Sequence, residues 1–160
     1  MKPGRKILER YILGEKLSSG SQATVYLAED ERTSARVVAK IFPSNRLDEH
    51  EQKRLQREIQ ILSQLEHPHI IRYLDSGVIE DSIDVLILEY GKGEPLDQLL
   101  KTHCFPLSDV LMLGKQLAHA LFTAHHLGIV HRDIKPSNVL VQFDQNGCLQ
   151  SSSLLDFGVA

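Results

Sequence analysis

The chain has 160 residues with a formal charge of −3, and 42% of them are hydrophobic and 24% charged. This composition is typical of a soluble globular domain and excludes a disordered chain, and the small charge gives no reason to expect a nucleic-acid or membrane partner. Cys104 and Cys148 are too few for a disulfide framework, and neither a membrane-spanning run nor a secretion signal is visible, so we expect a cytoplasmic protein with no membrane segment.

The first 42 residues predict short strands. Apolar stretches at 11–17 and 25–28 flank small and polar residues at 18–24, which indicates a β-hairpin with a small-residue loop. Residues 36–42 predict a further strand. Its alternation separates two faces, with Val37, Ala39 and Ile41 on one and Val38, Lys40 and Phe42 on the other.

Residues 47–65 are rich in helix formers and carry an apolar stripe at helical spacing. Glu58 falls within that stripe, where a carboxylate is costly unless a cation or a donor meets it. Two interpretations stay open at this point: a glutamate at the rim that reaches solvent, or an ion pair with a buried lysine. His67-Pro68 ends the helix, and strands are expected at 70–74 and 85–90.

The second half of the chain begins with the best linker candidate, residues 91–95. A long helix is expected at about 108–127, and it is apolar over much of its circumference. Helices of this kind are normally buried on several sides. Apolar runs at 139–141 and 154–155 flank Asn146-Gly147, a strong hairpin signal.

Two of the four clusters that could support chemistry lie in the first half of the chain. Residues 17–25 include several small residues, among them Ser18, Gly20 and Ala23, and small residues let backbone N–H groups approach phosphate oxygens closely. Taken alone, this segment favours an ordinary hairpin loop. Lys40 would need an anion if it faces inward, although alone it is slightly more often a lysine at the edge of a sheet.

The other two clusters lie in the second half. In the string 131–138, Asp133 could accept a proton, Lys135 could hold a phosphoryl group and Asn138 could bind a hard cation. A solvated polar turn explains single members of this set but not the ordered string. Asp156, in Asp-Phe-Gly after a strand, could be a Mg²⁺ ligand, although such a tripeptide means little by itself.

Together and in this order, the four clusters resemble the signature of the protein kinases. Lys135, two residues after Asp133, is the pattern of serine/threonine kinases, and the chain looks most similar to bacterial kinases of the eukaryotic type. The resemblance implies an α+β, two-lobe fold. Residues 1–90 would form a complete, β-rich, nucleotide-binding small lobe with one helix. Residues 91–160 would form the first part of the helical large lobe, with hinge, long helix, catalytic loop and D-F-G.

The resemblance also implies ATP and Mg²⁺ as cofactors and a protein substrate with a Ser or Thr hydroxyl. Asp133 would be the catalytic base, Lys135 would steady the transferred phosphoryl group, and Asn138 and Asp156 would bind the metal. Lys40 would contact the α- and β-phosphates while paired with Glu58. The full set of implied nucleotide-binding residues is Leu17, Ser18, Gly20, Ala23, Val25, Val38, Lys40, Glu58, Glu89, Gly91 and Leu140.

Several features depart from the family pattern, one of them a span from Val139 to Leu155 that is longer than the family's usual connection. Ser18 and Ala23 replace the first and third glycines of the loop, although the central Gly20 remains. Val38 replaces the usual alanine and narrows the adenine pocket. The sequence stops at Ala160, soon after Asp-Phe-Gly, so we expect a fragment that lacks the activation segment and the later helices.

Two functions other than that of a kinase are compatible with parts of the sequence. A non-catalytic ATP-binding or protein-interaction module could be made from half a kinase domain, docking through the long apolar helix. A metal-binding protein built on the eight histidines is poorly supported, because His119, His125 and His126 lack the i, i+4 spacing of a helical metal pair.

Overall fold

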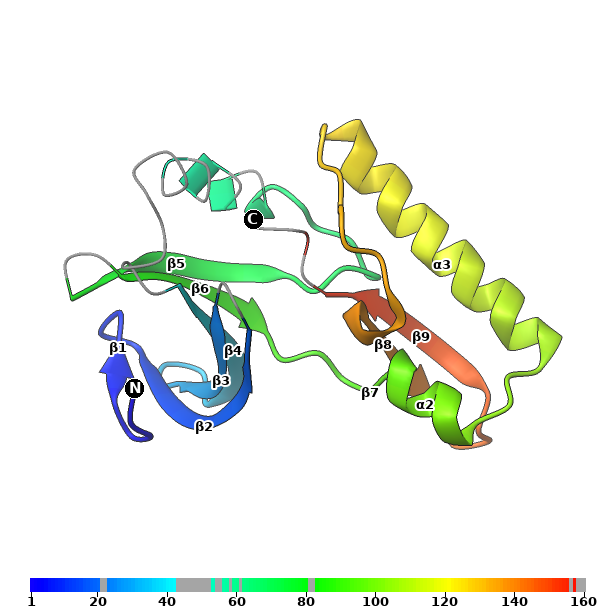
Figure 1. Cartoon of the computed structure of the whole chain (residues 1–160), viewed down its shortest axis with the longest axis horizontal. Coiled ribbons are helices and arrows are strands. Elements are labelled where there is room, and N and C mark those ends of the chain that lie inside the picture. The colour runs from blue at the N-terminus through cyan, green and yellow to red at the C-terminus, as the bar shows by residue number, and fades with distance from the viewer. Residues whose placement is uncertain are drawn as a thin grey trace. The chain divides into compact units, whose positions relative to one another are not determined.

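The computed structural model describes residues 1–20, 23–42, 53, 56–57, 59–60, 62–80, 83–155 and 157. The chain divides into two compact units (Figure 1). Unit 1 consists of Met1–Ser63 and Tyr73–Tyr90, and unit 2 of Gln64–Arg72 and Gly91–Val159.

Unit 1 is built on a six-stranded antiparallel sheet with the order β1-β2-β3-β4-β6-β5. Figure 1 shows its strands curling around one another. The strands are β1 (Lys6–Ile7), β2 (Tyr11–Ser19), β3 (Thr24–Asp30), β4 (Ala35–Phe42), β5 (Tyr73–Ile79) and β6 (Ile83–Glu89). Residues 53, 56–57, 59–60 and 62 are helical. The predicted hairpin is confirmed as β2 and β3, and the predicted strand at 36–42 as β4.

The core of unit 1 lies on one face of this sheet. Val37, Ala39 and Ile41 are each at most 5% exposed and pack with buried residues of the neighbouring strands. The other members of this cluster are Ile7, Tyr11, Leu13, Tyr26, Ala28, Val85 and Ile87. The predicted alternation of β4 is therefore confirmed, since its odd-numbered residues face the core.

The strand expected at 70–74 is misplaced by the sequence argument. Ile70 instead forms an isolated parallel bridge to Leu154 in unit 2, and the strand runs over Tyr73–Ile79. Its polar residues are tolerated in a half-buried strand because they have partners. Tyr11 donates a hydrogen bond to Asp75 at 2.9 Å, and Ser76 shares one with the Tyr73 hydroxyl at 2.9 Å.

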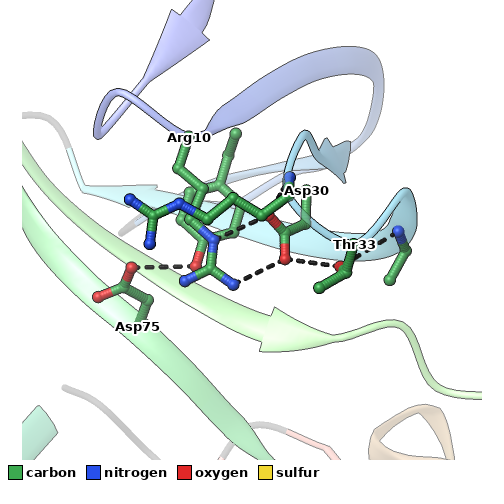
Figure 2. A network of polar contacts seen from close by, with 7 residues as sticks. Arg10, Asp30, Thr33 and Asp75 are labelled. Atoms are coloured by element: carbon green, nitrogen blue, oxygen red, sulfur yellow. Dashed lines mark hydrogen bonds and ion pairs between the residues drawn. The ribbon is translucent and has the colours of Figure 1, made fainter.

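A polar network ties the first strands together and connects them to β5 (Figure 2). Arg10 donates two hydrogen bonds to the Asp30 carboxylate, at 2.8 and 2.7 Å, and Thr33 donates a third at 2.7 Å. The bond from Tyr11 to Asp75 joins β2 to β5, which are not neighbours in the sheet. Burial and the hydrogen bond to Asp75 raise the pKa of Tyr11 to about 12.

The Arg10 guanidinium holds the pKa of the Asp30 carboxyl well below its usual range. A lowered pKa means that the carboxylate stabilises the fold above its unfolded-state pKa, and that this contribution is lost as the pH falls. We expect Asp30→Asn to melt at a lower temperature than the parent at pH 7. The gap should narrow once the pH falls below about 5, near the ordinary carboxyl range. Circular dichroism melts over this range test it, and Glu29→Gln, an exposed neighbour, should show no such gap.

Unit 2 contains a three-stranded antiparallel sheet with the order β7-β8-β9. Its elements are β7 (Glu94–Pro95), the helices α2 (Leu96–Thr102) and α3 (Leu107–His126), the 3₁₀ turn η2 (Pro136–Asn138), β8 (Val139–Phe143) and β9 (Leu149–Leu154). Figure 1 shows α3 running alongside β9. Gln116 of α3 accepts hydrogen bonds from the backbone and the hydroxyl of Ser152, both at 2.8 Å.

Three expectations for unit 2 can be compared with these elements. The long helix is confirmed to within one residue at each end, and the hairpin around Asn146-Gly147 is confirmed as β8 and β9. The linker candidate 91–95 ends in an ordered strand, because Glu94 pairs with Val141.

The apolar pattern of α3 is typical of a helix buried on several sides, but a chain without the later helices is expected to leave it exposed, and the structure confirms this exposure. Within this helix, Asp109, Ala120 and Ala124 are buried, while large apolar side chains remain exposed. The exposed ones are Leu107, Val110, Leu111, Met112 and Phe122. In the described part of the chain, no helix is long and apolar enough to cross a membrane.

Candidate functional site

The sheet of unit 1 brings three predicted nucleotide-binding residues to one face. Lys40 lies directly opposite Val25 on one side and Leu86 on the other, and Val38 lies opposite Leu88. Directly opposed residues in antiparallel strands point to the same face, and so do residues two apart in one strand. Val25, Val38 and Lys40 therefore share the face that is turned away from the core.

Lys40 is half-buried on this face. Its Nζ lies 5.7 Å from the centre of the Phe42 ring, within the reach of about 6 Å for a cation–π contact. The ion pair expected between Lys40 and Glu58 lies outside the described residues, because Glu58 is not among them. It therefore stays a prediction.

The loop between β2 and β3 is closed by one backbone hydrogen bond, from the N–H of Gly20 to the carbonyl of Ala23 at 2.9 Å. Ala23 is buried, whereas Leu17 and Ser18 are exposed. A Cβ at Gly20 would lie 3.5 Å from the Ala23 oxygen, an ordinary van der Waals distance. Nothing among the described residues of the loop therefore requires glycine at position 20.

Gly91 and Leu140, both predicted to contact the nucleotide, lie against each other in unit 2. A Cβ at Gly91 would come within 2.3 Å of a Leu140 methyl and 2.7 Å of an Ile71 methyl, so a side chain at 91 would displace both. Glu89 ends β6 in unit 1, where it is half-buried opposite Val37.

The three residues predicted for the catalytic loop form one hydrogen-bonded group in unit 2. Lys135 Nζ donates to Oδ2 of Asp133 at 2.6 Å. Asn138 Nδ2 donates to the same oxygen at 2.9 Å and to the Asp133 backbone carbonyl at 2.8 Å. Lys135, and then Asn138, lower the pKa of the Asp133 carboxyl, which keeps it ionised at neutral pH. Oδ1 of Asp133 has no hydrogen-bond partner among the described residues.

The Asn138 amide can serve two purposes, because its nitrogen holds Asp133 in place while its oxygen stays available as a ligand. Its side chain is buried and its amide nitrogen is occupied by Asp133, which leaves the amide oxygen for a cation. An amide oxygen is a ligand type that Mg²⁺ and Ca²⁺ accept. The second predicted ligand, Asp156, lies outside the described residues.

Sequence reasoning gave no role to His131, which the structure shows to be the buried support of this loop. Its side chain is 1% exposed, and its Nε2 lies 2.8 Å from the Leu155 carbonyl. Its Nδ1 accepts from the Asp133 N–H at 3.3 Å, so Nε2 carries the proton. The ring also contacts the Phe157 ring, with centroids 4.7 Å apart and the two planes tilted by 51°. The sequence signal was its place two residues before Asp133, which does not distinguish a buried support from an exposed side chain.

The histidines form one contact of note, between Nε2 of His67 and Nδ1 of His119 at 3.1 Å. Burial and the neighbouring histidines lower the pKa of His67. In the described part of the chain, no group of three His, Cys, Asp or Glu side chains is arranged to hold a metal ion.

Comparison with known proteins decides the family. Residues 11–160 match the family model described as the protein kinase domain. The chain belongs to the protein kinase family. It is 36% identical over 155 residues to the serine/threonine-protein kinase pkn2 of Myxococcus xanthus, an alignment that covers 94% of this chain and 18% of that protein. It is also 36% identical over 160 residues to the serine/threonine-protein kinase PrkC of Bacillus subtilis, covering 98% of this chain and 24% of the relative.

Solved structures agree with the family. The PknI kinase domain of Mycobacterium tuberculosis superposes with a TM-score of 0.80 and 26% identity, covering 100% of this chain and 64% of that domain. The α+β, two-lobe kinase fold expected from the sequence is thereby confirmed. The kinase-family chain spans about a fifth to a quarter of the length of the two bacterial relatives.

Proposed function

We propose that this chain carries the nucleotide-binding and catalytic residues of a serine/threonine protein kinase, which transfers the γ-phosphoryl group of Mg-ATP to a Ser or Thr hydroxyl of a protein. Residues 1–90 are proposed as the small lobe and 91–160 as the first part of the large lobe. The arrangement of Asp133, Lys135 and Asn138 is the observation that carries the proposal. Kinase relatives that are named for serine/threonine specificity support it.

Two sets of residues are proposed to bind the nucleotide. In unit 1, Leu17, Val25 and Val38 contact the adenine, and Lys40, paired with Glu58, contacts the phosphates. The backbone of the loop around Ser18, Gly20 and Ala23 cradles the phosphates, because small side chains leave its N–H groups accessible. Leu140, and backbone groups from Glu89 to Gly91, complete the adenine contacts. The shared face of Val25, Val38 and Lys40 supports this assignment.

The hydroxyl of the protein substrate is proposed to donate its hydrogen bond to Oδ1 of Asp133. Phosphoryl transfer passes through a loose transition state in most analyses, so catalysis depends mainly on positioning and on offsetting charge. A carboxyl with a lowered pKa suits this role: it is ionised and accepts the hydroxyl hydrogen bond, although it is a weak base. Lys135 steadies the phosphoryl oxygens. Bound Mg²⁺, held by the Asn138 amide oxygen and the Asp156 carboxylate, supplies positive charge against the phosphates.

Transfer of label from γ-labelled ATP to a generic basic protein, followed by phosphoamino-acid analysis, tests the function. Label on serine or threonine that disappears when Mg²⁺ is chelated supports the proposal. Label on tyrosine contradicts the specificity. Nucleotide binding without transfer would favour the second candidate, a non-catalytic ATP-binding or interaction module, for which the exposed apolar side chains of α3 are the observation.

Gly20→Ala should weaken ATP binding without lowering stability. Without bound nucleotide, the loop between β2 and β3 has room for a Cβ at position 20, so the melting temperature should not change. With nucleotide bound, a phosphate lying against the loop backbone would collide with the added methyl group. We expect a loss of about tenfold in ATP affinity, or ~1.4 kcal/mol. Calorimetric titration and thermal melts measure the two quantities.

Gly147→Ala is the matched control for Gly20→Ala. Gly147 has φ of 77° in the turn between β8 and β9, with open space around its Cα. This variant should lose about 1–2 kcal/mol of stability through backbone strain while binding ATP normally. Unchanged ATP affinity in Gly20→Ala would contradict the loop's proposed role.

The proposed cellular location is the cytosol. Cys104 and Cys148 are both exposed free thiols, which supports a reducing compartment.

A further inference from the structure

A pocket of about 390 Å³ lies in unit 1. It opens between the helical residues 56, 59 and 60 and the strands β5 and β6, and its lining includes Gln56, Ile59, Gln60, Ser76, Val78 and Asp84. Its volume falls within the range of roughly 300 to 1,000 Å³ typical of small-molecule sites. The described lining shares no residue with the set assigned to ATP, so the pocket is a separate feature of the unit.

Asp84 distinguishes this pocket from an ordinary surface hollow. It lies on β6 opposite Phe42 of β4 and Val78 of β5, and it is only 6% exposed. Among the described residues, its carboxylate has no hydrogen bond or ion pair. Burial therefore raises the pKa of its carboxyl without any opposing partner.

The other buried carboxylates in the described chain are satisfied. Asp30 has Arg10 and Thr33, and Asp109 accepts a hydrogen bond from the backbone of Leu149 at 3.3 Å. A buried carboxylate without a partner is costly, and proteins normally pair or hydrogen-bond such groups. Asp84, on the wall of a pocket, is thus a buried carboxylate for which the described residues supply no partner and beside which the pocket leaves space for a bound cation.

The rest of the lining restricts what that partner is. Gln56 and Gln60 offer neutral carboxamides, while Ile59 and Val78 provide apolar surface. The hydroxyl of Ser76 is already bonded to Tyr73. A single carboxylate is a poor cage for a metal ion, which requires several oxygen ligands. It suits one organic cation whose stem packs on the apolar side chains.

We propose that this pocket binds an organic monocation, an ammonium or guanidinium group on a short aliphatic stem, with the charged head on Asp84. Such a head forms a charge-assisted hydrogen bond to the carboxylate and removes the cost of leaving it unpartnered. The cation is either the side chain of a basic residue in a peptide or a free alkylamine or alkylguanidine. Both sources share the chemistry that Asp84 recognises.

Titration of the 160-residue chain with n-butylguanidinium, followed by amide NMR at constant ionic strength, tests the proposal. We expect saturable shifts at Val78 and Asp84 in the millimolar range or tighter, and none with neutral n-butylurea. Asp84→Asn should weaken binding roughly tenfold or more. Glu29→Gln, which removes an exposed charge outside the pocket, should not. A capped tripeptide with a central arginine distinguishes the sources: tighter binding than butylguanidinium indicates a peptide side chain, and weaker binding a free small molecule.

Val78→Trp provides a second variant that keeps the carboxylate. Val78 is half-exposed at the pocket, so a larger side chain should fill the site and block the cation while the NMR spectrum stays that of a folded protein. Three results would overturn the proposal: equal binding of butylurea, undiminished binding in folded Asp84→Asn, or no saturable shifts at the pocket in the parent chain.

Discussion

Asp133→Asn is expected to lower the rate of phosphoryl transfer to a serine or threonine substrate by about 100- to 10,000-fold, the usual contribution of a positioned acid or base. The change removes the negative charge that Lys135 and Asn138 hold in place. An asparagine at 133 would have the same shape but could not take up the proton of the acceptor hydroxyl. Because the substituted group is exposed, the fold should persist.

The test compares initial rates of label transfer from γ-labelled ATP, together with ATP affinity by calorimetry. Affinity should be unchanged, since Asp133 is assigned to the acceptor and not to the nucleotide. Asp97→Asn, a carboxylate at the start of α2 outside the loop, is the matched control and should retain full activity. Transfer that continues at the parent rate in Asp133→Asn would remove Asp133 from the catalytic role. ATP binding without any transfer in the parent chain would instead make the ATP-binding module the better account.

The parts of the fold that the sequence predicted are those that local pattern determines. The alternation of β4 follows from a period of two, so Val37 and Ala39 had to share one face and Val38 and Lys40 the other. The bounds of α3 follow from its run of helix formers, which begins after a proline and ends before Gly128. In both cases the deciding interactions lie within a few residues of one another.

The parts that failed depend on partners far away in the sequence. Asp75 is acceptable in a strand because Tyr11, distant along the chain, donates to it. No local pattern contains that information, and the strand was expected too early. The same limit applies to α3: its apolar circumference shows which side chains the helix can bury, whereas the residues that pack against it decide which of them it does bury.

The candidate site shows the same contrast between residues whose arrangement follows from local sequence and residues whose role depends on distant partners. The spacing of Asp133, Lys135 and Asn138 within one loop allowed the sequence to place them together, and the structure joins them through shared hydrogen bonds. His131 was missed because its role depends on the Leu155 carbonyl and the Phe157 ring, which reach it from beyond the loop. The pocket at Asp84 was equally invisible, since a lone aspartate beside a polar turn gives no sign of being buried.

Gly93→Ala should be the most destabilising single-methyl change in the described part of unit 2. Gly93 has φ of 104°, a conformation that residues with a side chain rarely adopt. An added Cβ would lie 2.3 Å from the Val141 oxygen and 2.7 Å from its carbonyl carbon. Those atoms belong to β8, which is held between β7 and β9 and cannot move aside cheaply. Strain and displacement together should cost about 2–5 kcal/mol.

Amide hydrogen exchange measures where in the chain Gly93→Ala loses stability. Amides of β8 should exchange faster in Gly93→Ala, whereas those of β4 in unit 1 should keep their protection, because the clash is confined to unit 2. Gly128→Ala separates the two causes: Gly128 also has positive φ, of 73°, but has open space for a Cβ. It should therefore lose only about 1–2 kcal/mol, from the backbone alone. Equal destabilisation in the two variants would show that backbone strain, and not contact with β8, is why position 93 is glycine.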